Sequence, residues 1–158
     1  MQGVGYVNEL LARLTGQPVH DKTQTNHTLD DNPATFPLDR AFYADFTHDT
    51  LLTAVFAAIG LLEQSENLTT TQIDKGRTYI SSELVPFSGR MVTEKITCGG
   101  SGYEPQGTYV RVLVNDAVQP LEFCNASLYG LCTLSDFVES QSFARTNGDG
   151  LWAECFST

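Results

Sequence analysis

His48 and Asp49 are adjacent residues whose side chains suit the chemistry of phosphate esters. A histidine can hold a phosphoryl oxygen, and a carboxylic acid can protonate a departing alkoxide. The alternative is structural, because an aspartate at the start of a helix caps or charges its first turn while the histidine packs nearby. No nucleophile accompanies the pair, so both interpretations stay open on these two residues alone.

The segments on either side of the pair predict a junction between a strand and a helix. Residues 41–46 are largely apolar, which is typical of a short strand buried on both faces. Residues 49–62 are apolar nearly all round and predict an interior helix. In open α/β sheets ligands bind beyond the carboxyl ends of strands, and the first turn of a helix offers unpaired N–H groups to a phosphate. His48 would lie at such a position.

The N-terminal region predicts one amphipathic helix followed by a long loop. Gly16 and Pro18 end a helical pattern in which apolar residues recur at spacings of three and four: Val4, Val7, Leu10, Leu11 and Leu14. Residues 17–40 are rich in Thr, Asn, Asp and Pro and show little periodicity. We interpret them as an excursion over the surface and not as a domain linker.

The C-terminal half predicts strands and a last helix. Strands are expected over residues 87–98 and 109–114, and Asn115-Asp116 supplies a two-residue turn into residues 117–121, which makes a hairpin. A pattern close to a capping box starts a last helix over residues 133–145. Since strands and helices intermix along the chain, the predicted class is α/β.

The composition fits one ordinary domain and excludes some classes of partner. The chain has 158 residues, of which 41% are hydrophobic, and a formal net charge of −10. That charge argues against nucleic acid or an anionic membrane as a partner. The longest apolar stretch, residues 51–62, is too short to span a bilayer, and the first residues do not resemble a signal peptide. No spacing typical of a metal site occurs, so neither a metal nor another cofactor is expected.

Sequons and cysteines favour a secreted protein. Asn26, Asn67 and Asn125 each begin an N-x-[ST] glycosylation sequon. Four cysteines accompany them and allow three full sets of disulfide pairings. Cys124 and Cys132 are close enough in sequence for a local bridge. Cys98 and Cys155 could pair with each other or with cysteines outside this chain.

An ordered set of segments resembles one known family over essentially the whole chain. The segments are GVGYVNELLARLT, DNPATFPLD, YADFTHD, VPFSGR, YVRVLVNDAVQPL, LYGLCTLSDFV and WAECFS. They are similar to the C-terminal part of the secreted fungal phytases, which belong to the histidine acid phosphatases. The resemblance favours the catalytic interpretation of His48 and Asp49.

The resemblance implies a fold of which this chain holds only a portion. Members of the family fold as an α/β domain around a largely parallel sheet flanked by helices, with a smaller helical domain inserted earlier in the chain. Residues 1–158 would then be the C-terminal part of the α/β domain. The N-terminal part and the inserted helical domain would lie outside this chain.

The resemblance also implies an activity and the roles of particular residues. The family hydrolyses phosphomonoesters, with phytate (inositol hexakisphosphate) as the expected substrate, through a phosphohistidine intermediate. Its nucleophile lies in an R-H-G-x-R-x-P motif, which is absent from this sequence. By motif match, His48 binds phosphate and Asp49 is the proton donor. The resemblance pairs Cys124 with Cys132 and gives Cys98 and Cys155 partners outside the chain.

Two other functions remain alternatives. Phytases of this type often carry Asn directly after the H-D pair, where this chain has Thr50, so a general acid phosphatase with low phytate selectivity is the nearer one. The other is a secreted fragment that binds without catalysing. Under the phosphatase interpretation, the chain by itself is expected to be inactive because it lacks the nucleophile.

Overall fold

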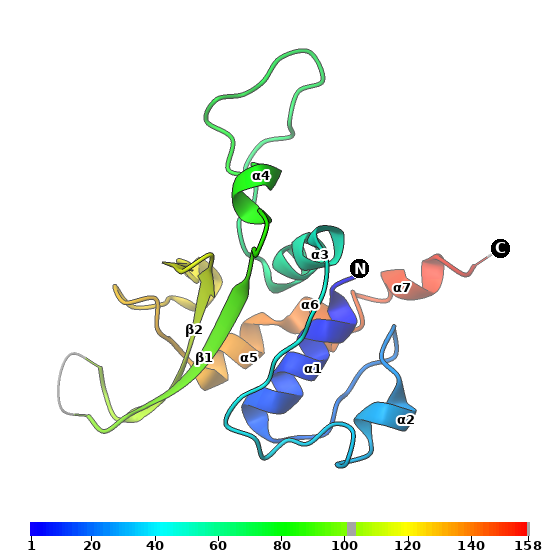
Figure 1. The fold of residues 1–158 in the computed structure, drawn as a ribbon, viewed down its shortest axis with the longest axis vertical. Helices are drawn as coiled ribbons and strands as arrows, with labels where there is room; N and C mark the ends of the chain where they lie inside the picture. Colours follow the sequence, from blue (N-terminus) through cyan, green and yellow to red (C-terminus); the bar gives the residue numbers. More distant parts are fainter. Residues whose placement is uncertain (101–103, 158) are drawn as a thin grey trace.

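The computed structural model describes residues 1–100 and 104–157, and its centre is a small sheet packed against helices from both ends of the chain (Figure 1). The sheet consists of β1 (Met91–Cys98), β2 (Gly107–Val114), β3 (Ala117–Val118) and β4 (Cys132–Thr133). β2 is the central strand and pairs with each of the other three. Its register with β1 runs from Met91 opposite Val114 to Cys98 opposite Gly107.

The hairpin follows from local sequence signals. Asn115 and Asp116 both have positive φ, at 49° and 68°, as a type I′ turn between twisted strands requires. Val110, Val112 and Val114 alternate along β2 and are 0–4% exposed, so one face of the hairpin closes the core. The predicted hairpin is therefore present, although β3 ends at Val118.

α1 (Val4–Thr15) forms as the sequence predicts and is held at its C-terminal end by the sheet. It ends at Gly16, whose φ of 70° is left-handed and whose N–H bonds to the Ala12 carbonyl. The Nζ of Lys95 on β1 donates to the Leu14 carbonyl at 2.7 Å. This cation satisfies a carbonyl that has no partner within the helix and fixes α1 relative to the hairpin.

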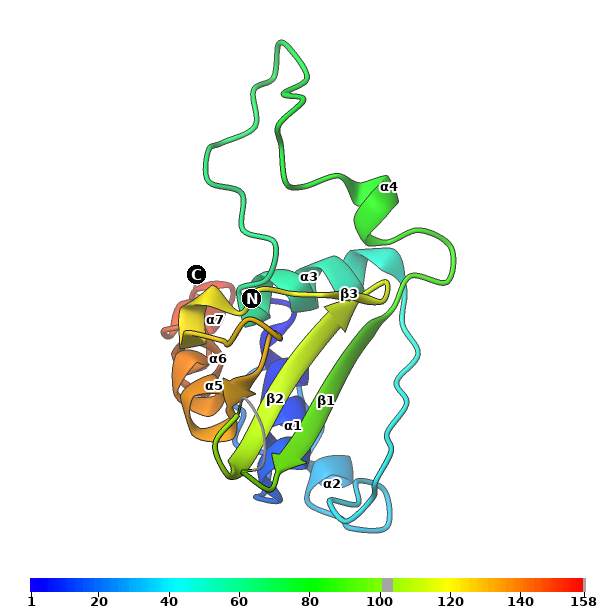
Figure 2. The same ribbon diagram turned by 90° about the vertical axis from the view of Figure 1, so that its left-hand side faces the viewer.

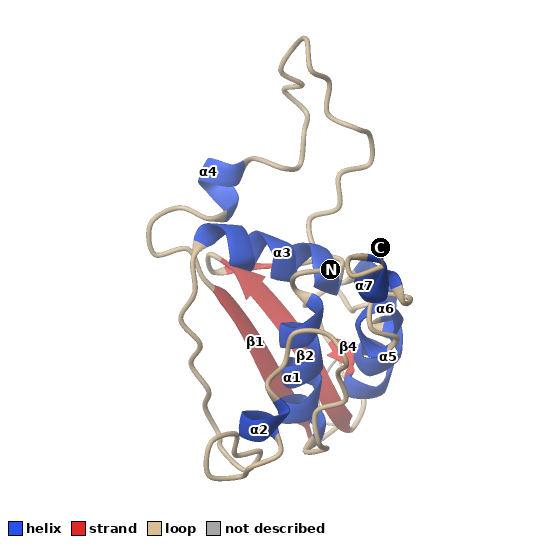
Figure 3. Cartoon of the chain, turned by 90° about the vertical axis from the view of Figure 1, so that its right-hand side faces the viewer, coloured by secondary structure: helices blue, strands red, loops and turns tan. Residues whose placement is uncertain are grey.

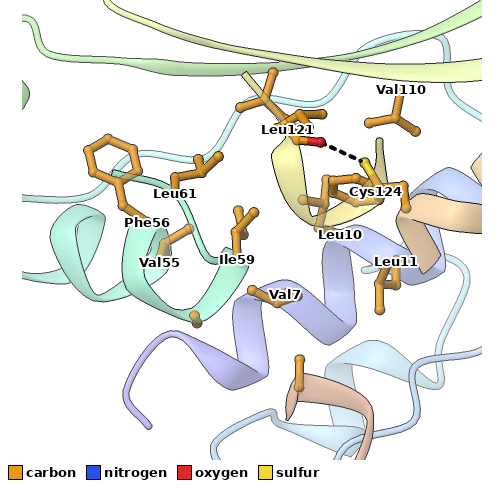
Figure 4. Packing of buried hydrophobic residues seen from close by; sticks show 14 of the residues in the cluster. Val7, Leu10, Leu11, Val55, Phe56, Ile59, Leu61, Val110, Leu121 and Cys124 are labelled. Carbon is orange, nitrogen blue, oxygen red and sulfur yellow. Dashed lines mark hydrogen bonds between the residues drawn. The ribbon is translucent and has the colours of Figure 1, made fainter. Parts of the chain in front are cut away.

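α3 (Asp49–Ile59) lies across α1 and shares the main core with it (Figure 4). A Cβ atom at Gly3 would lie only 2.3 Å from the Ala54 carbonyl oxygen, so the two helices approach too closely there for any larger residue. The prediction of a fully interior helix is wrong for the first half. Leu51 and Leu52 are only half-buried, whereas Val55, Phe56, Ala58 and Ile59 are buried.

The remaining elements are short, and the two helices that directly follow β4 pack against the sheet and α1 (Figure 2). These short elements are α2 (His27–Asp30), α4 (Ser81–Leu84), the 3-10 turn η1 (Glu122–Cys124), α5 (Leu134–Ser140), α6 (Ser142–Arg145) and α7 (Leu151–Glu154). Thr133 caps α5 by accepting from the Asp136 N–H at 3.1 Å, as the capping pattern predicts. The single last helix expected over residues 133–145 is instead broken at Gln141, whose buried amide donates to the Ile59 carbonyl at the end of α3.

Two expectations about the sheet need correction. The α/β class is confirmed, but all the strand pairings among the described residues are antiparallel, where the resemblance implied a largely parallel sheet. The strand predicted over residues 41–46 does not form. That segment is an extended connection from α2 to α3 with Phe42 and Phe46 81% and 97% exposed (Figure 3). A strand needs a neighbour for its N–H and C=O groups, and none of the described strands pairs with it.

None of the helices within residues 1–100 and 104–157 combines the length and the apolar character needed to cross a membrane.

Candidate active site

His48 and Asp49 occupy the N-terminal end of α3. His48 is the N-cap residue in an extended conformation, and its carbonyl accepts the N–H of Leu52 at 3.0 Å. Asp49 is the first helical residue, and its Oδ1 accepts the N–H of Thr50 at 2.7 Å. Both side chains are exposed, and within the described part of the chain the His48 ring makes one hydrogen-bond contact, of 3.4 Å to the Thr47 hydroxyl. The His48 imidazole and the second Asp49 oxygen are therefore accessible to a ligand.

The pair opens into a cleft of about 1100 Å³. One wall is the half-buried first half of α3, and the opposite wall is the connection from α4 into β1, residues 85–91. Much of the lining is apolar, which suits the exclusion of water from a reacting group. Arg90 is the one Lys or Arg among the described lining residues, and its guanidinium pairs with Asp116 across the hairpin turn.

His48 is the one histidine of the chain that lines the cleft. His20 and His27 do not line it, although they are the other histidines of the chain. His20 is exposed, and the Nε2 of His27 lies 2.7 Å from the Asp21 carbonyl oxygen. The expectation that the nucleophile lies outside this chain, with His48 as a phosphate-binding residue, stays a prediction.

A second group of ionisable residues lies on α1, on the side that faces the connection leading to His48. Tyr6, Glu9 and Arg13 stand three and four residues apart and so share one face of the helix. Arg13 pairs with Asp45, three residues before His48. Burial, and secondarily the Asp45 carboxylate, raise the pKa of Tyr6 to about 12. The helical spacing of these residues is visible in the sequence, but their contact with the segment before His48 is not.

Burial raises the pKa of Glu9 to about 7, with contributions from the Asp30, Asp45 and Asp21 carboxylates against the lowering effect of Arg13. In the unfolded chain this carboxyl should titrate near its ordinary value of 4.5. The folded state therefore binds the Glu9 proton more tightly, and its stability falls as the pH rises from about 4.5 to about 7.

We expect Glu9→Gln to stabilise the native protein at about pH 8 by about 1–2 kcal/mol and to have little effect at about pH 4. At about pH 4, below the pKa of Glu9 in both the folded and the unfolded protein, the carboxyl is mostly protonated in either state. The native protein then pays no cost for a buried charge, and the amide has nothing to relieve. Urea unfolding at the two pH values measures the difference. Glu139→Gln, an exposed carboxyl on helix α5, is the matched control and should show no such dependence. Equal effects of Glu9→Gln at both pH values would contradict the prediction.

The predicted modification sites are placed as follows. Asn26, Asn67 and Asn125 are all exposed. The Asn26 side chain caps α2 through its carbonyl oxygen, which accepts the N–H of Thr28 and leaves the amide nitrogen outside that bond. Glycosylation at these residues remains a prediction.

One disulfide is present among the four cysteines, and partners for Cys98 and Cys155 outside this chain remain a prediction. Cys124 and Cys132 form a disulfide that joins η1 to β4. Cys98, at the end of β1, is half-buried, and Cys155 is exposed near the C-terminal end. Both are free thiols in this structure. The residues that the structure describes contain no cluster of three or more His, Cys, Asp or Glu side chains able to hold a metal ion.

Comparison with known proteins gives consistent matches. The model of the histidine phosphatase superfamily (branch 2) matches residues 1–115. The chain is 47% identical to Phytase A of Aspergillus oryzae over 159 aligned residues, covering 99% of this chain and 33% of that protein. It is 48% identical to Phytase A of Aspergillus awamori, covering 98% of this chain and 32% of the relative. The chain therefore spans about a third of the length of these curated relatives.

A solved structure is also similar. The crystal structure of the phytase from D. castellii superimposes with a TM-score of 0.65 at 27% sequence identity. The match covers 92% of this chain and 26% of that one. The likeness therefore extends from the sequence to the arrangement of the elements.

Proposed function

The chain belongs to branch 2 of the histidine phosphatase superfamily, and from this we propose that it is the C-terminal portion of a secreted acid phosphatase that hydrolyses phosphomonoesters, phytate among them. The observation that carries the proposal is the His48–Asp49 pair at the start of α3, exposed to the cleft. The relatives are phytases by name, and the chain spans only a third of each.

The two side chains would take complementary parts in the reaction. A histidine from the R-H-G-x-R-x-P motif outside this chain attacks phosphorus, an N–P bond forms, and the P–O bond to the alcohol breaks. Asp49 gives its carboxylic proton to the departing oxygen, which leaves poorly as an alkoxide. His48 holds a phosphoryl oxygen during the transfer. Water then releases inorganic phosphate from the phosphohistidine.

One observation favours the second candidate, a general acid phosphatase with low phytate selectivity. Phytate carries many negative charges, yet Arg90 is the only Lys or Arg that the described part of this chain contributes to the cleft. Selectivity for phytate therefore depends on basic side chains from outside this chain. Thr50, directly after the pair, supplies no charge.

The test uses the native protein from its source. We expect a mass well above the 17.3 kDa of this chain and, in non-reducing peptide maps, disulfides that join Cys98 and Cys155 to peptides outside it. The same protein should release phosphate from phytate and from an aryl phosphate at acid pH. His48→Ala should abolish both activities, whereas His20→Ala, at an exposed residue outside the cleft, should leave them unchanged.

Two results would contradict the proposal. One is a native protein of 17.3 kDa in which Cys98 is bridged to Cys155, because then no further portion exists. The other is a longer protein without acid phosphatase activity. Efficient turnover of the aryl phosphate with little release from phytate would favour the general phosphatase instead.

A further inference from the structure

The segment that leads to His48 lacks the support that a helix or a strand would give it. Residues 37–47 follow Phe36 and lie outside regular secondary structure. In the described part of the chain they make no backbone–backbone hydrogen bond to one another or to another element. The position of His48 therefore depends on α3, which follows it in the chain, and on the contacts that hold residues 37–47, which precede it.

Arg13 of α1 holds it. Its guanidinium makes a two-pronged contact with the Asp45 carboxylate, with Nη1 at 2.5 Å from Oδ2 and Nη2 at 3.1 Å from Oδ1. The same group lies over the Phe36 ring, 4.8 Å from its centroid, and over the Tyr43 ring at 5.0 Å. The Arg13 side chain is only 12% exposed and the Asp45 side chain 39%, so the arginine is shielded from water while the carboxylate is partly open to it.

Arg13 itself stands on a firmly packed helix. Its neighbours Leu10, Leu11 and Leu14 are 5–7% exposed in the main core, and Lys95 fixes the end of the helix from β1. α1 also packs closely against α3 at Gly3. The helix that carries Arg13 therefore supports both sides of the junction at which His48 and Asp49 lie.

We propose that Arg13 is a positioning residue for His48 and Asp49, acting through Asp45 and the ring of Tyr43. This inference rests on the proposed phosphatase function. Arg13 does not line the cleft, whereas Asp45 does, so Arg13 acts on the reacting groups only through the segment that it holds. A lysine cannot replace it, because an ammonium group offers no planar fork to the carboxylate and no flat surface to two rings.

If Arg13 positions Asp49, substituting Arg13 should lower kcat by a factor that depends on the leaving group of the substrate. Proton transfer from Asp49 requires its carboxyl to stay within hydrogen-bonding reach of the departing oxygen, and a misplacement of about 1 Å can cost about 100-fold. In the complete protein, Arg13→Lys and Arg13→Gln should lower kcat on an alkyl phosphate by about tenfold to 100-fold. An activated aryl phosphate, which needs little protonation, should lose several times less. Simple unfolding would reduce both rates equally.

The controls separate positioning from general stability. Arg40→Gln removes an exposed arginine from the same segment. Among the described residues Arg40 pairs only with the adjacent Asp39, so this variant should not change either rate. Urea unfolding of each variant gives the folded fraction by which the rates are corrected. The double variant Arg13→Gln/Asp45→Asn should show a loss of kcat on the alkyl phosphate no larger than that of the more affected single variant. Both substitutions break the same contact, so their effects should not add.

The outcomes that would overturn the inference differ from those that would overturn the function. Equal corrected losses on both substrates, or an Arg13→Lys variant as active as the unmodified protein, would refute the positioning role. The milder Arg13→Lys variant decides the matter if Arg13→Gln does not fold. A complete protein with no phosphatase activity before any substitution would instead refute the proposed function.

Discussion

Replacing Asp49 with asparagine should slow the hydrolysis of alkyl phosphates by the complete protein about 10²–10⁴-fold. An amide has no carboxylic proton to give to the departing alkoxide, although it keeps the size of the side chain. An activated aryl phosphate should be affected far less, because its phenolate departs without protonation. Measuring kcat of both proteins on the two substrates at acid pH gives the loss for each substrate and the ratio between the two losses.

Asp49 also lies in the first turn of α3, where a negative charge favours the helix by about 0.3–1 kcal/mol. Asp136→Asn provides the matched control, since Asp136 is exposed in the first turn of α5 and does not line the cleft. That variant reports the loss of a helix-terminal charge alone and should leave both rates unchanged. If Asp49→Asn lowered the two rates equally, Asp49 would not be the proton donor.

The 158-residue chain produced alone is expected to show no measurable phosphatase activity and poor stability. It lacks the R-H-G-x-R-x-P motif, so under the proposed function His48 and Asp49 would bind phosphate and donate a proton without an attacking group. It also exposes several large apolar side chains almost completely: Phe42, Phe46, Phe87 and Leu128, at 81–105% of their reference areas. Surface of this kind binds hydrophobic dyes and promotes association.

Expression of the chain with and without the remaining portion gives the comparison. Co-folding under oxidising conditions should restore activity and shift unfolding to higher urea, because the exposed apolar residues are covered and Cys98 and Cys155 gain partners. The His48→Ala form of the isolated chain gives the background of the assay. Turnover by the isolated chain above that background would show that no further portion is needed.

Local signals made much of the fold predictable. The spacing of apolar residues and Gly16 gave α1 almost to the residue, and Asn115-Asp116 gave the hairpin turn. Thr133 marked the start of α5, and the H-D pair marked the start of α3. Each of these features depends on residues within a few positions of one another, where backbone preferences dominate.

The failures concern contacts that the sequence does not display. The strand predicted over residues 41–46 requires neighbouring strands, which the described part of this chain does not provide. The break at Gln141 depends on a carbonyl of α3 that lies 82 positions away in the sequence. The contact between Arg13 and Asp45 joins residues 32 positions apart, and no periodic pattern marks Asp45 as the partner of Arg13.

The long loop of residues 60–80 projects from the body of the molecule (Figure 2). We therefore expect proteases to cleave the folded protein in this loop. Its base is tied where the Gln64 side chain accepts the N–H groups of Thr78 and Tyr79, and further out the hydrogen bonds are local, such as that from the Thr69 hydroxyl to the Gln72 carbonyl. A protease can draw such a segment into its cleft without unfolding the core. The cut leaves His48 and Asp49 on one fragment and the hairpin on the other, while both fragments still share one hydrophobic core. The cleaved molecule should therefore give two bands in a denaturing gel and a single peak in gel filtration.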